Sequence, residues 1–361
     1  MDNTLRDHLK AQIRRASPDK SGGPFSDAAF NALALDVFAF QYHNNAFYRR
    51  YCSLIGKDAA AVSKIADIPF LPIQFFKNQD IKTGNWTAET IFSSSGTTGM
   101  TTSQHFTREV DFYKHIARQG FEQFYGKIDN YCILGLLPSY LERSGSSLIA
   151  MVDDFIQLSK HPQSGFFLNE HAELAQILRG CQAANVPTLL IGVSFGLLDF
   201  VENYTIDFPE LIVMETGGMK GRRREMIRAE LHETIAKGFG VSTIHSEYGM
   251  TELFSQGYSR GHGIFEATAT LRVLSREIND PLSCFVPIHQ SLNELSDGVT
   301  SSHPVTMSGK LGILNVIDLA NLDTCSFIAT DDLGRVYSDG RFEVLGRLDN
   351  SDMRGCNLLV A

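Results

Sequence analysis

Apolar and polar positions follow two patterns along this chain, and each pattern predicts a type of element. Residues 26–55 carry apolar side chains at helical spacing, which predicts one or two packed helices. In residues 66–84, Pro69 and Pro72 exclude a helix and favour an extended, largely apolar strip. The chain then alternates short apolar runs with helical stretches. The expected strands are 131–137, 188–193, 211–215 and 241–245, and the expected helices are 111–125, 170–184, 195–201 and 222–237.

This alternation predicts an α/β fold with a mostly parallel sheet and flanking helices. After about Gly263 the helical periodicity fades, and short segments predict a smaller β-rich subdomain. These segments are 267–273, 312–318, 326–329, 335–337 and 341–345.

Composition narrows the class of protein. A hydrophobic fraction of 43% with 20% charged residues is ordinary for a globular protein. The net charge of −9 gives no basic surface for nucleic acid or an anionic membrane, so we expect small molecules or proteins as partners. No apolar stretch reaches the roughly 20 residues of a membrane span, and the first 23 residues resemble an amphipathic helix more than a signal peptide. We therefore expect a cytoplasmic protein. The six cysteines lack the spacing of a zinc site or a disulfide framework.

The segment SSSGTTG, residues 93–99, follows an apparent strand and is a candidate phosphate loop. Glycine lets successive backbone N–H groups turn toward one anion, and small hydroxyl side chains add donors. The candidate ligands of a triphosphate are Ser94, Ser95, Gly96, Thr97, Thr98 and Gly99. A plain flexible loop would show the same composition, and no Walker A lysine follows Gly99.

The segment EYGMTE, residues 247–252, also follows an expected strand. The Tyr248 ring can stack on adenine, the Thr251 hydroxyl can bind the α-phosphate, and the Glu252 carboxylate can hold Mg²⁺ between phosphate oxygens. A surface turn that caps the next helix is the alternative.

Two further segments fit a nucleotide. Asp332 can accept hydrogen bonds from ribose hydroxyls, and Arg347, beyond an Asp-Gly hairpin turn, can reach ribose or phosphate. Gly217 and Gly218 follow an expected strand and allow backbone to approach adenine closely. Each segment alone would also fit a plain turn, but chance matches at four strand ends in one order are much less credible.

Together these segments resemble the ANL superfamily of adenylate-forming enzymes, which carry a phosphate loop, YGxTE, TGD and GRxD motifs. Three further segments resemble its acyl-protein synthetase branch, the LuxE family: LPSYLERSGSSL at 137–148, TGGMKGRRRE at 216–225 and RGCNLL at 354–359. The resemblance implies the large N-terminal domain of such an enzyme without the full C-terminal lysine domain. It divides the chain into a helical region and strip at 1–90, an α/β nucleotide-binding core at 91–262, a β-rich subdomain at 263–345 and a hinge-like tail at 346–361.

The same resemblance implies the reaction. A carboxylic acid, expected to be a fatty acid, would react with ATP and Mg²⁺ to give acyl-AMP, with Thr251 and Glu252 acting on the phosphates. Cys356 would then accept the acyl group as a thioester and pass it to an acceptor protein. Transfer to CoA, as in an acyl-CoA ligase, and non-catalytic binding of a nucleotide or acyl-adenylate are the alternatives.

The chain departs from the superfamily pattern at the end of the phosphate loop. Thr101, Thr102 and Ser103 stand where the superfamily has Pro-Lys, so this loop supplies no lysine to the pyrophosphate. The candidates for a replacing cation are Lys220, Arg222 and His245.

Overall fold

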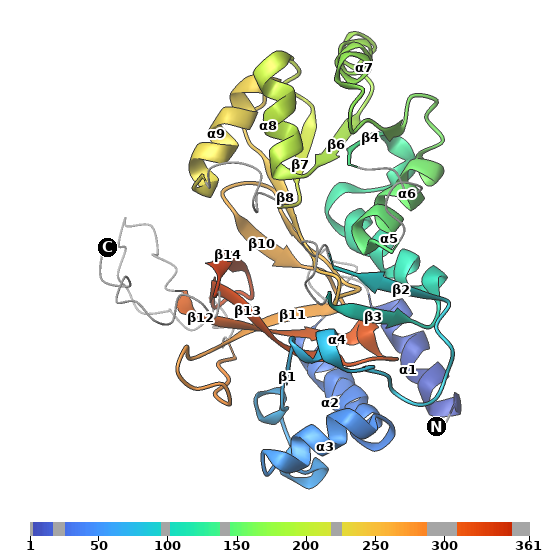
Figure 1. Ribbon diagram of the computed structural model, residues 1–361, viewed down its shortest axis with the longest axis vertical. Coiled ribbons are helices and arrows are strands. Elements are labelled where there is room, and N and C mark those ends of the chain that lie inside the picture. Colours follow the sequence, from blue (N-terminus) through green and yellow to red (C-terminus); the bar gives the residue numbers. More distant parts are fainter. Residues whose placement is uncertain are drawn as a thin grey trace, which may run out of the picture.

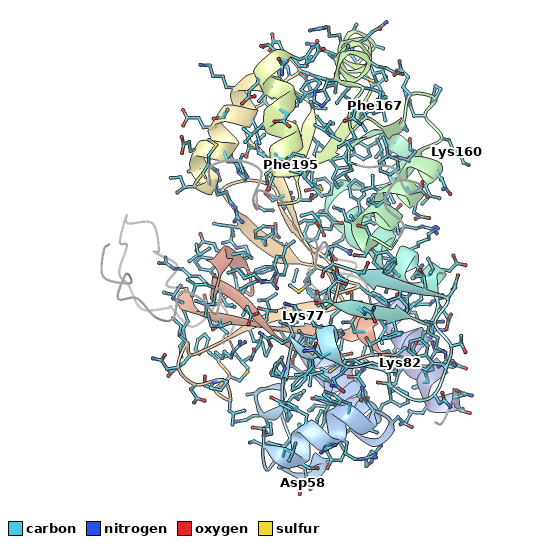
Figure 2. All side chains as sticks on the ribbon, in the orientation of Figure 1. Asp58, Lys77, Lys82, Lys160, Phe167 and Phe195 are labelled. Carbon is cyan, nitrogen blue, oxygen red and sulfur yellow. The ribbon has the colours of Figure 1, made fainter. Side chains whose placement is uncertain are left out.

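The structure is a computed structural model that describes residues 3–16, 26–94, 102–137, 145–217, 226–286 and 309–348. Its parallel strands and helices α7–α9 form one end of an elongated molecule, and helices α1–α4 cover the other end (Figure 1). Side chains fill the space around the sheet in both halves; Phe167 and Phe195 lie in the half that carries α7–α9 (Figure 2). The α/β fold class predicted from the sequence is confirmed.

The N-terminal helices begin at polar caps. The Ser26 hydroxyl accepts a hydrogen bond from the Ala29 N–H (3.3 Å), and the Asn45 side chain accepts one from the Tyr48 N–H (2.9 Å). The elements of this region are α1 (Asn3–Arg15), α2 (Asp27–Asn44), α3 (Ala46–Leu54), β1 (Leu71–Pro72) and α4 (Phe75–Asn78). The expected extended strip thus contains β1, which pairs with a strand of the main sheet 257 residues later, Leu71 opposite Ile328.

The parallel part of the main sheet has the strand order β8-β7-β6-β4-β5. Its elements are α5 (Val110–Tyr125), β4 (Cys132–Leu136), α6 (Ser147–Ser159), β5 (Gly165–Phe166), α7 (His171–Ala183), β6 (Thr188–Gly192), α8 (Ser194–Asn203), β7 (Ile212–Glu215), α9 (Arg228–Phe239) and β8 (His245–Tyr248). Every residue of β4 and β6 is buried, because helices pack on both faces of these strands.

The same sheet continues in antiparallel pairs. The strand order from β8 onward is β9-β10-β14-β13-β12-β11. These strands are β9 (Gly257–Ser259), β10 (Ile264–Ala267), β11 (Leu271–Arg276), β12 (Lys310–Asp318), β13 (Phe327–Val336) and β14 (Phe342–Arg347). A separate two-stranded hairpin pairs β2 (Thr90–Ser93) with β3 (Gln104–Thr107).

Several elements differ from the pattern-based expectation. Helix α6 and strand β5 were not expected, and the segment expected at 267–273 runs from the end of β10 into β11. Helix α9 starts at Arg228 rather than 222, and it ends at Phe239 with Gly240 in the left-handed region (φ 69°). The strand expected at 241–245 instead begins at His245, because residues 241–244 carry the chain back to the sheet. Asp332 lies inside β13 rather than at a strand end, since the two segments expected at 326–329 and 335–337 belong to one ten-residue strand.

Among the described residues, no helix has both the length and the apolar character that crossing a membrane requires. The five cysteines in this part of the chain are all free thiols, four of them buried.

Helix α1 is fixed to the rest of the structure by a buried ion pair. The Arg6 guanidinium donates to both carboxylate oxygens of Asp323, with Nε at 2.6 Å from Oδ1, and also to Glu109 (2.7 Å). Arg6 is 4% exposed, and Arg108 lies 3.2 Å from the same Asp323. Bidentate geometry and several partners favour a net contribution from such a pair.

We predict that Arg6→Ala lowers the free energy of unfolding by about 3 kcal/mol, because Asp323 is left buried with Arg108 as its remaining cation. Arg15→Ala, at an exposed position of the same helix, is the matched control and should change the free energy of unfolding by less than about 0.5 kcal/mol. Urea unfolding of both variants checks this. Equal effects would show that α1 does not depend on the ion pair.

Candidate functional site

A cavity of about 1220 Å³ lies beside the carboxyl ends of β7 and β8. Gly217, Tyr248, Asp332 and Arg347, predicted from three separate segments, all line it. In a parallel sheet this edge is where ligands bind, because the chain reverses direction there and leaves side chains exposed. The structure therefore brings together the residues that were expected to hold adenine and ribose.

Tyr248, Asp332 and Arg347 form a connected group. The Tyr248 hydroxyl donates to Asp332 Oδ2 at 2.9 Å, and Arg347 Nε lies 3.7 Å from Asp332 Oδ1. Asp332 and Arg347 are direct cross-strand partners in β13 and β14. Burial and the neighbouring Asp332 carboxylate hold the pKa of Tyr248 well above its usual range, so its hydroxyl keeps its proton.

The Tyr248 ring is fixed by two phenylalanines. It packs edge-on against Phe342 (5.3 Å between ring centroids) and against Phe265 (6.0 Å), which stack on each other. The ring is 8% exposed and lines the cavity. Such packing fixes the ring plane before any ligand binds.

Gly217 forms the turn after β7. It has a φ of 75°, a left-handed conformation that glycine adopts without strain. Its N–H donates to Glu215 Oε1 (2.7 Å), and its carbonyl accepts from the Ser194 N–H (3.0 Å). Among the described residues, no atom lies within 4 Å of the place that a Cβ at Gly217 would take, which leaves room on that side for a flat ring to approach the backbone.

Glu215 supports this turn and was not among the residues expected from the sequence. Its buried carboxylate also accepts from the Ser194 hydroxyl and lies 3.8 Å from His232 Nε2. That separation is too long for a hydrogen bond, so any effect of His232 on the Glu215 carboxylate is electrostatic. Burial alone would raise the pKa of Glu215, but its partners outweigh burial and lower it.

Glu247, the first residue of the EYGMTE segment, was expected to lie there but had no assigned role. It lines the cavity, and its carboxylate lies against Gly249, where a Cβ atom would come within 2.3 Å of Oε1. Burial, with a contribution from the charge of Glu215, raises the pKa of Glu247 to about 8. A glutamate before the tyrosine and a glycine after it are the sequence signals of this arrangement.

Thr251 and Glu252 lie on the turn after β8, next to the cavity lining rather than in it. Glu252 is 5% exposed; burial raises its pKa, while a hydrogen bond from Ser103 and the charge of Arg347 oppose that shift. Mg²⁺ in phosphate-binding sites usually takes one or two protein carboxylates and completes its shell with phosphate and water. A single buried carboxylate beside Asp332 fits that pattern, and the described part of the chain holds no cluster of three acidic, His or Cys ligands.

The candidate phosphate loop is the turn of the β2–β3 hairpin. Ser94 and Ser103 face each other at its base: the Ser94 N–H donates to the Ser103 carbonyl (3.1 Å), and the Ser103 N–H donates to the Ser94 hydroxyl (3.0 Å). The Ser103 side chain lies near the Glu252 carboxylate and opposes the rise in its pKa, so this base lies next to the turn that follows β8.

Several expected residues lie outside the described residues. These are Ser95, Gly96, Thr97, Thr98, Gly99, Gly218, Lys220, Arg222 and Cys356. His245 is described, and its surroundings disfavour the charged form that the suggested cation role requires. Burial, with the nearby charge of Arg260, lowers the pKa of His245 to about 4, and its Nδ1 lies 3.1 Å from the Tyr125 hydroxyl.

The two glutamates of the cavity should change stability with pH in opposite directions. The folded chain keeps the Glu247 proton up to about pH 8, whereas the unfolded chain loses it near its ordinary pKa of 4.5. We predict that Glu247→Gln gains stability relative to the unmutated chain as the pH rises from 5 to 8, by up to about 1.4 kcal/mol per pH unit.

Glu215 has a lowered pKa, so its contribution is present above the ordinary pKa and is lost as the pH falls. Glu215→Gln should therefore be the less stable chain at pH 7, by a difference that shrinks toward pH 4. Urea unfolding across this range measures both. The same pH trend in the two variants would contradict the assigned protonation states.

Comparison with solved structures identifies the fold. A 2-hydroxyisobutyryl-CoA ligase, solved in the postadenylation state with 2-HIB-AMP, superimposes with a TM-score of 0.57 at 12% identity, covering 90% of this chain and 69% of the ligase. An O-succinylbenzoate coenzyme A synthetase from Bacillus subtilis, solved with ATP and magnesium, gives a TM-score of 0.45 at 17% identity over 73% of this chain and 51% of its own length. The fold assignment rests on the first of these.

Sequence comparison adds a match to one family model over part of the chain. No curated protein matches this chain significantly. The family model described as "Acyl-protein synthetase, LuxE" matches residues 17–119, which include helices α2–α4 and the β2–β3 hairpin. The fold is thus that of the N-terminal domain of an adenylate-forming ligase, and the resemblance to the LuxE acyl-protein synthetases is confirmed over residues 17–119.

Proposed function

We propose that this protein activates a carboxylic acid with ATP to form an acyl-adenylate and pyrophosphate. The observation that carries the proposal is the group of Tyr248, Asp332 and Arg347 on one wall of a cavity that Gly217 also lines. An aromatic ring, an open glycine backbone, a carboxylate and a guanidinium are the groups that a nucleoside phosphate requires. The fold and the family match support the same reaction.

Each residue has a place in nucleotide binding. Adenine would lie between the Tyr248 ring and the backbone at Gly217, on the side where no described atom lies within 4 Å of the place of a Cβ. The ribose hydroxyls would donate to the Asp332 carboxylate, whose Oδ2 accepts from Tyr248 and whose Oδ1 lies 3.7 Å from Arg347 Nε. Arg347, which is 45% exposed along its side chain, can turn toward the α-phosphate.

In the proposed first step, a carboxylate oxygen of the acid attacks the α-phosphorus of ATP. The bond from that phosphorus to the bridging oxygen breaks, and pyrophosphate leaves with the electron pair. Thr251 would donate to an α-phosphate oxygen, Glu252 would hold Mg²⁺, and residues 94–99 would bind the β- and γ-phosphates. The metal ion would supply charge neutralisation on the phosphates. Positioning of the reactants and electrostatic stabilisation would further lower the activation barrier of this step.

In the proposed second step, the Cys356 thiolate attacks the carbonyl carbon of the acyl-adenylate. The acyl–phosphate bond breaks, AMP leaves, and the acyl group is held as a thioester; the thiol proton goes to solvent. A fatty acid is the proposed substrate and an acceptor protein the proposed destination, as the LuxE resemblance implies. The neighbouring Arg354 would favour the thiolate.

Acid-dependent ATP–pyrophosphate exchange tests the first step, and intact-protein mass spectrometry after incubation with ATP, Mg²⁺ and a panel of acids tests the second. Exchange with one class of acid, and a mass increase equal to its acyl group, are the expected results. Acyl-CoA formed when CoA is added to the same incubation, without protein labelling, would show an acyl-CoA ligase. AMP binding without exchange across the panel would show a binding protein.

We predict that Glu252→Gln slows pyrophosphate exchange by about 100-fold or more at saturating acid, because removing a charged group that acts on the reacting phosphates costs about 3 kcal/mol. Glu173→Gln, on the exposed face of α7, is the matched control and should keep the full rate. Circular dichroism melting verifies that both variants fold. Undiminished exchange in folded Glu252→Gln would refute the metal-binding role.

We predict that Cys356→Ser still forms acyl-AMP, measured as exchange, but loses the thioester label on the protein. Cys284→Ser is the matched control and should keep the label, because burial raises the pKa of Cys284 to about 11 and leaves its thiol unreactive. Label that persists in Cys356→Ser and disappears in Cys284→Ser would assign the acceptor to Cys284 instead.

A further inference from the structure

His105 lies six residues after Gly99, the end of the candidate phosphate loop, and is completely buried. It is on β3, and its ring stacks on Phe254 at 4.5 Å with an interplanar angle of 29°. Phe76 meets the ring edge-on at 5.8 Å. A polar ring in such an aromatic environment has to satisfy both nitrogens through specific partners.

Both ring nitrogens have a partner. His105 Nδ1 lies 2.9 Å from the Thr251 carbonyl oxygen, and Nε2 lies 2.9 Å from the Thr324 hydroxyl. A carbonyl only accepts, so Nδ1 carries the proton and Nε2 accepts from the Thr324 hydroxyl. Burial lowers the pKa of His105 to about 4, which keeps the ring neutral in this one tautomer at physiological pH.

Thr324 is itself held by the N-terminal helices. Its carbonyl accepts from the Thr83 hydroxyl (2.6 Å) and from the Asn45 side-chain amide at the junction of α2 and α3 (3.0 Å). Asn321, three residues earlier, donates to the Glu252 carbonyl at 2.7 Å. Two consecutive carbonyls of the site turn, those of Thr251 and Glu252, are thus fixed by buried side chains.

We propose that His105 is a positioning residue that holds the Thr251–Glu252 turn in register with the β2–β3 hairpin, so that both meet the same triphosphate. The inference rests on the proposed function, because it concerns how that site is assembled. The His105–Thr251 hydrogen bond joins the hairpin to this turn, and Ser103 of the hairpin also lies near Glu252, the proposed metal carboxylate. The adenine and ribose contacts lie on β7, β8 and β13 and do not depend on the hairpin.

The proposal predicts a selective loss. In His105→Phe, the aromatic stacking remains and both hydrogen bonds are lost, so MgATP should bind at least about tenfold more weakly, while AMP binding should change by less than about twofold. His105→Asn keeps an amide donor near the Nδ1 position and should recover MgATP affinity to within about threefold of the unmutated chain. Thr324→Val leaves His105 Nε2 without its hydrogen-bond donor and should weaken MgATP binding, as His105→Phe does.

His171→Phe is the matched control. Like His105, His171 forms a hydrogen bond with a backbone carbonyl, with Nε2 at 3.2 Å from the Leu168 oxygen, and packs on a phenylalanine, Phe200. It lies on α7, away from the cavity. This variant should bind MgATP and AMP as the unmutated chain does. If His105→Phe does not fold, His105→Asn and Thr324→Val give the same comparison.

Isothermal titration with MgATP and with AMP measures the ratio of the two affinities in each variant. Equal weakening of both nucleotides, or His105→Asn no better than His105→Phe, would overturn the positioning role. Exchange measured on the same samples separates the two proposals. If the unmutated chain binds MgATP but catalyses no exchange, the adenylation proposal is refuted, and the affinity ratio still tests the role of His105. If it binds neither nucleotide, both proposals are refuted.

Discussion

The placement of the site turn depends on one buried carboxylate, that of Asp318 at the end of β12. Asp318 Oδ2 accepts from the backbone N–H groups of Phe254 (2.7 Å) and Ser255 (2.9 Å), and Oδ1 accepts from the Ser255 hydroxyl (2.7 Å) and the Ala320 N–H (3.0 Å). It has no exposed surface, so each of these bonds satisfies a group that water cannot reach. The carboxylate thereby joins the residues that follow the Tyr248–Glu252 turn to the start of segment 319–326. Asn321 of that segment donates to the Glu252 carbonyl, so the segment also contacts the turn itself.

The sheet explains why the site lies where it does. Parallel strands β4–β8 and the antiparallel strands β9–β14 belong to one sheet, and the change of direction occurs at β8, whose end carries Tyr248 (Figure 1). Asp332 comes from the middle of β13, where the register with β14 shifts between Leu333 and Gly334. The Tyr248–Asp332 hydrogen bond therefore joins the two parts of the sheet at the cavity, and a nucleotide bound there would contact both.

Much of this arrangement could be predicted from local pattern. The glycine-rich turn, the EYGMTE segment and the Asp-Gly hairpin each indicate the end of a strand. The alternation of apolar runs predicts the bounds of β4, β6 and β7 to within about one residue. What the pattern lacks is long-range pairing. The bond from Tyr248 to Asp332 spans 84 residues, and the bond from His105 to Thr251 spans 146. The role of Glu215 was missed for the same reason, because its partner Ser194 lies on another element.

The central claim is that one cavity at the edge of the sheet binds an acyl-adenylate. A crystal structure with a non-hydrolysable acyl-adenylate analogue tests it most directly. The account predicts adenine against the Tyr248 ring and the Gly217 backbone, with the ribose hydroxyls on Asp332 and the phosphate mimic facing Arg347 and Thr251. An analogue bound elsewhere, or a cavity that stays empty at saturating analogue, would contradict the account.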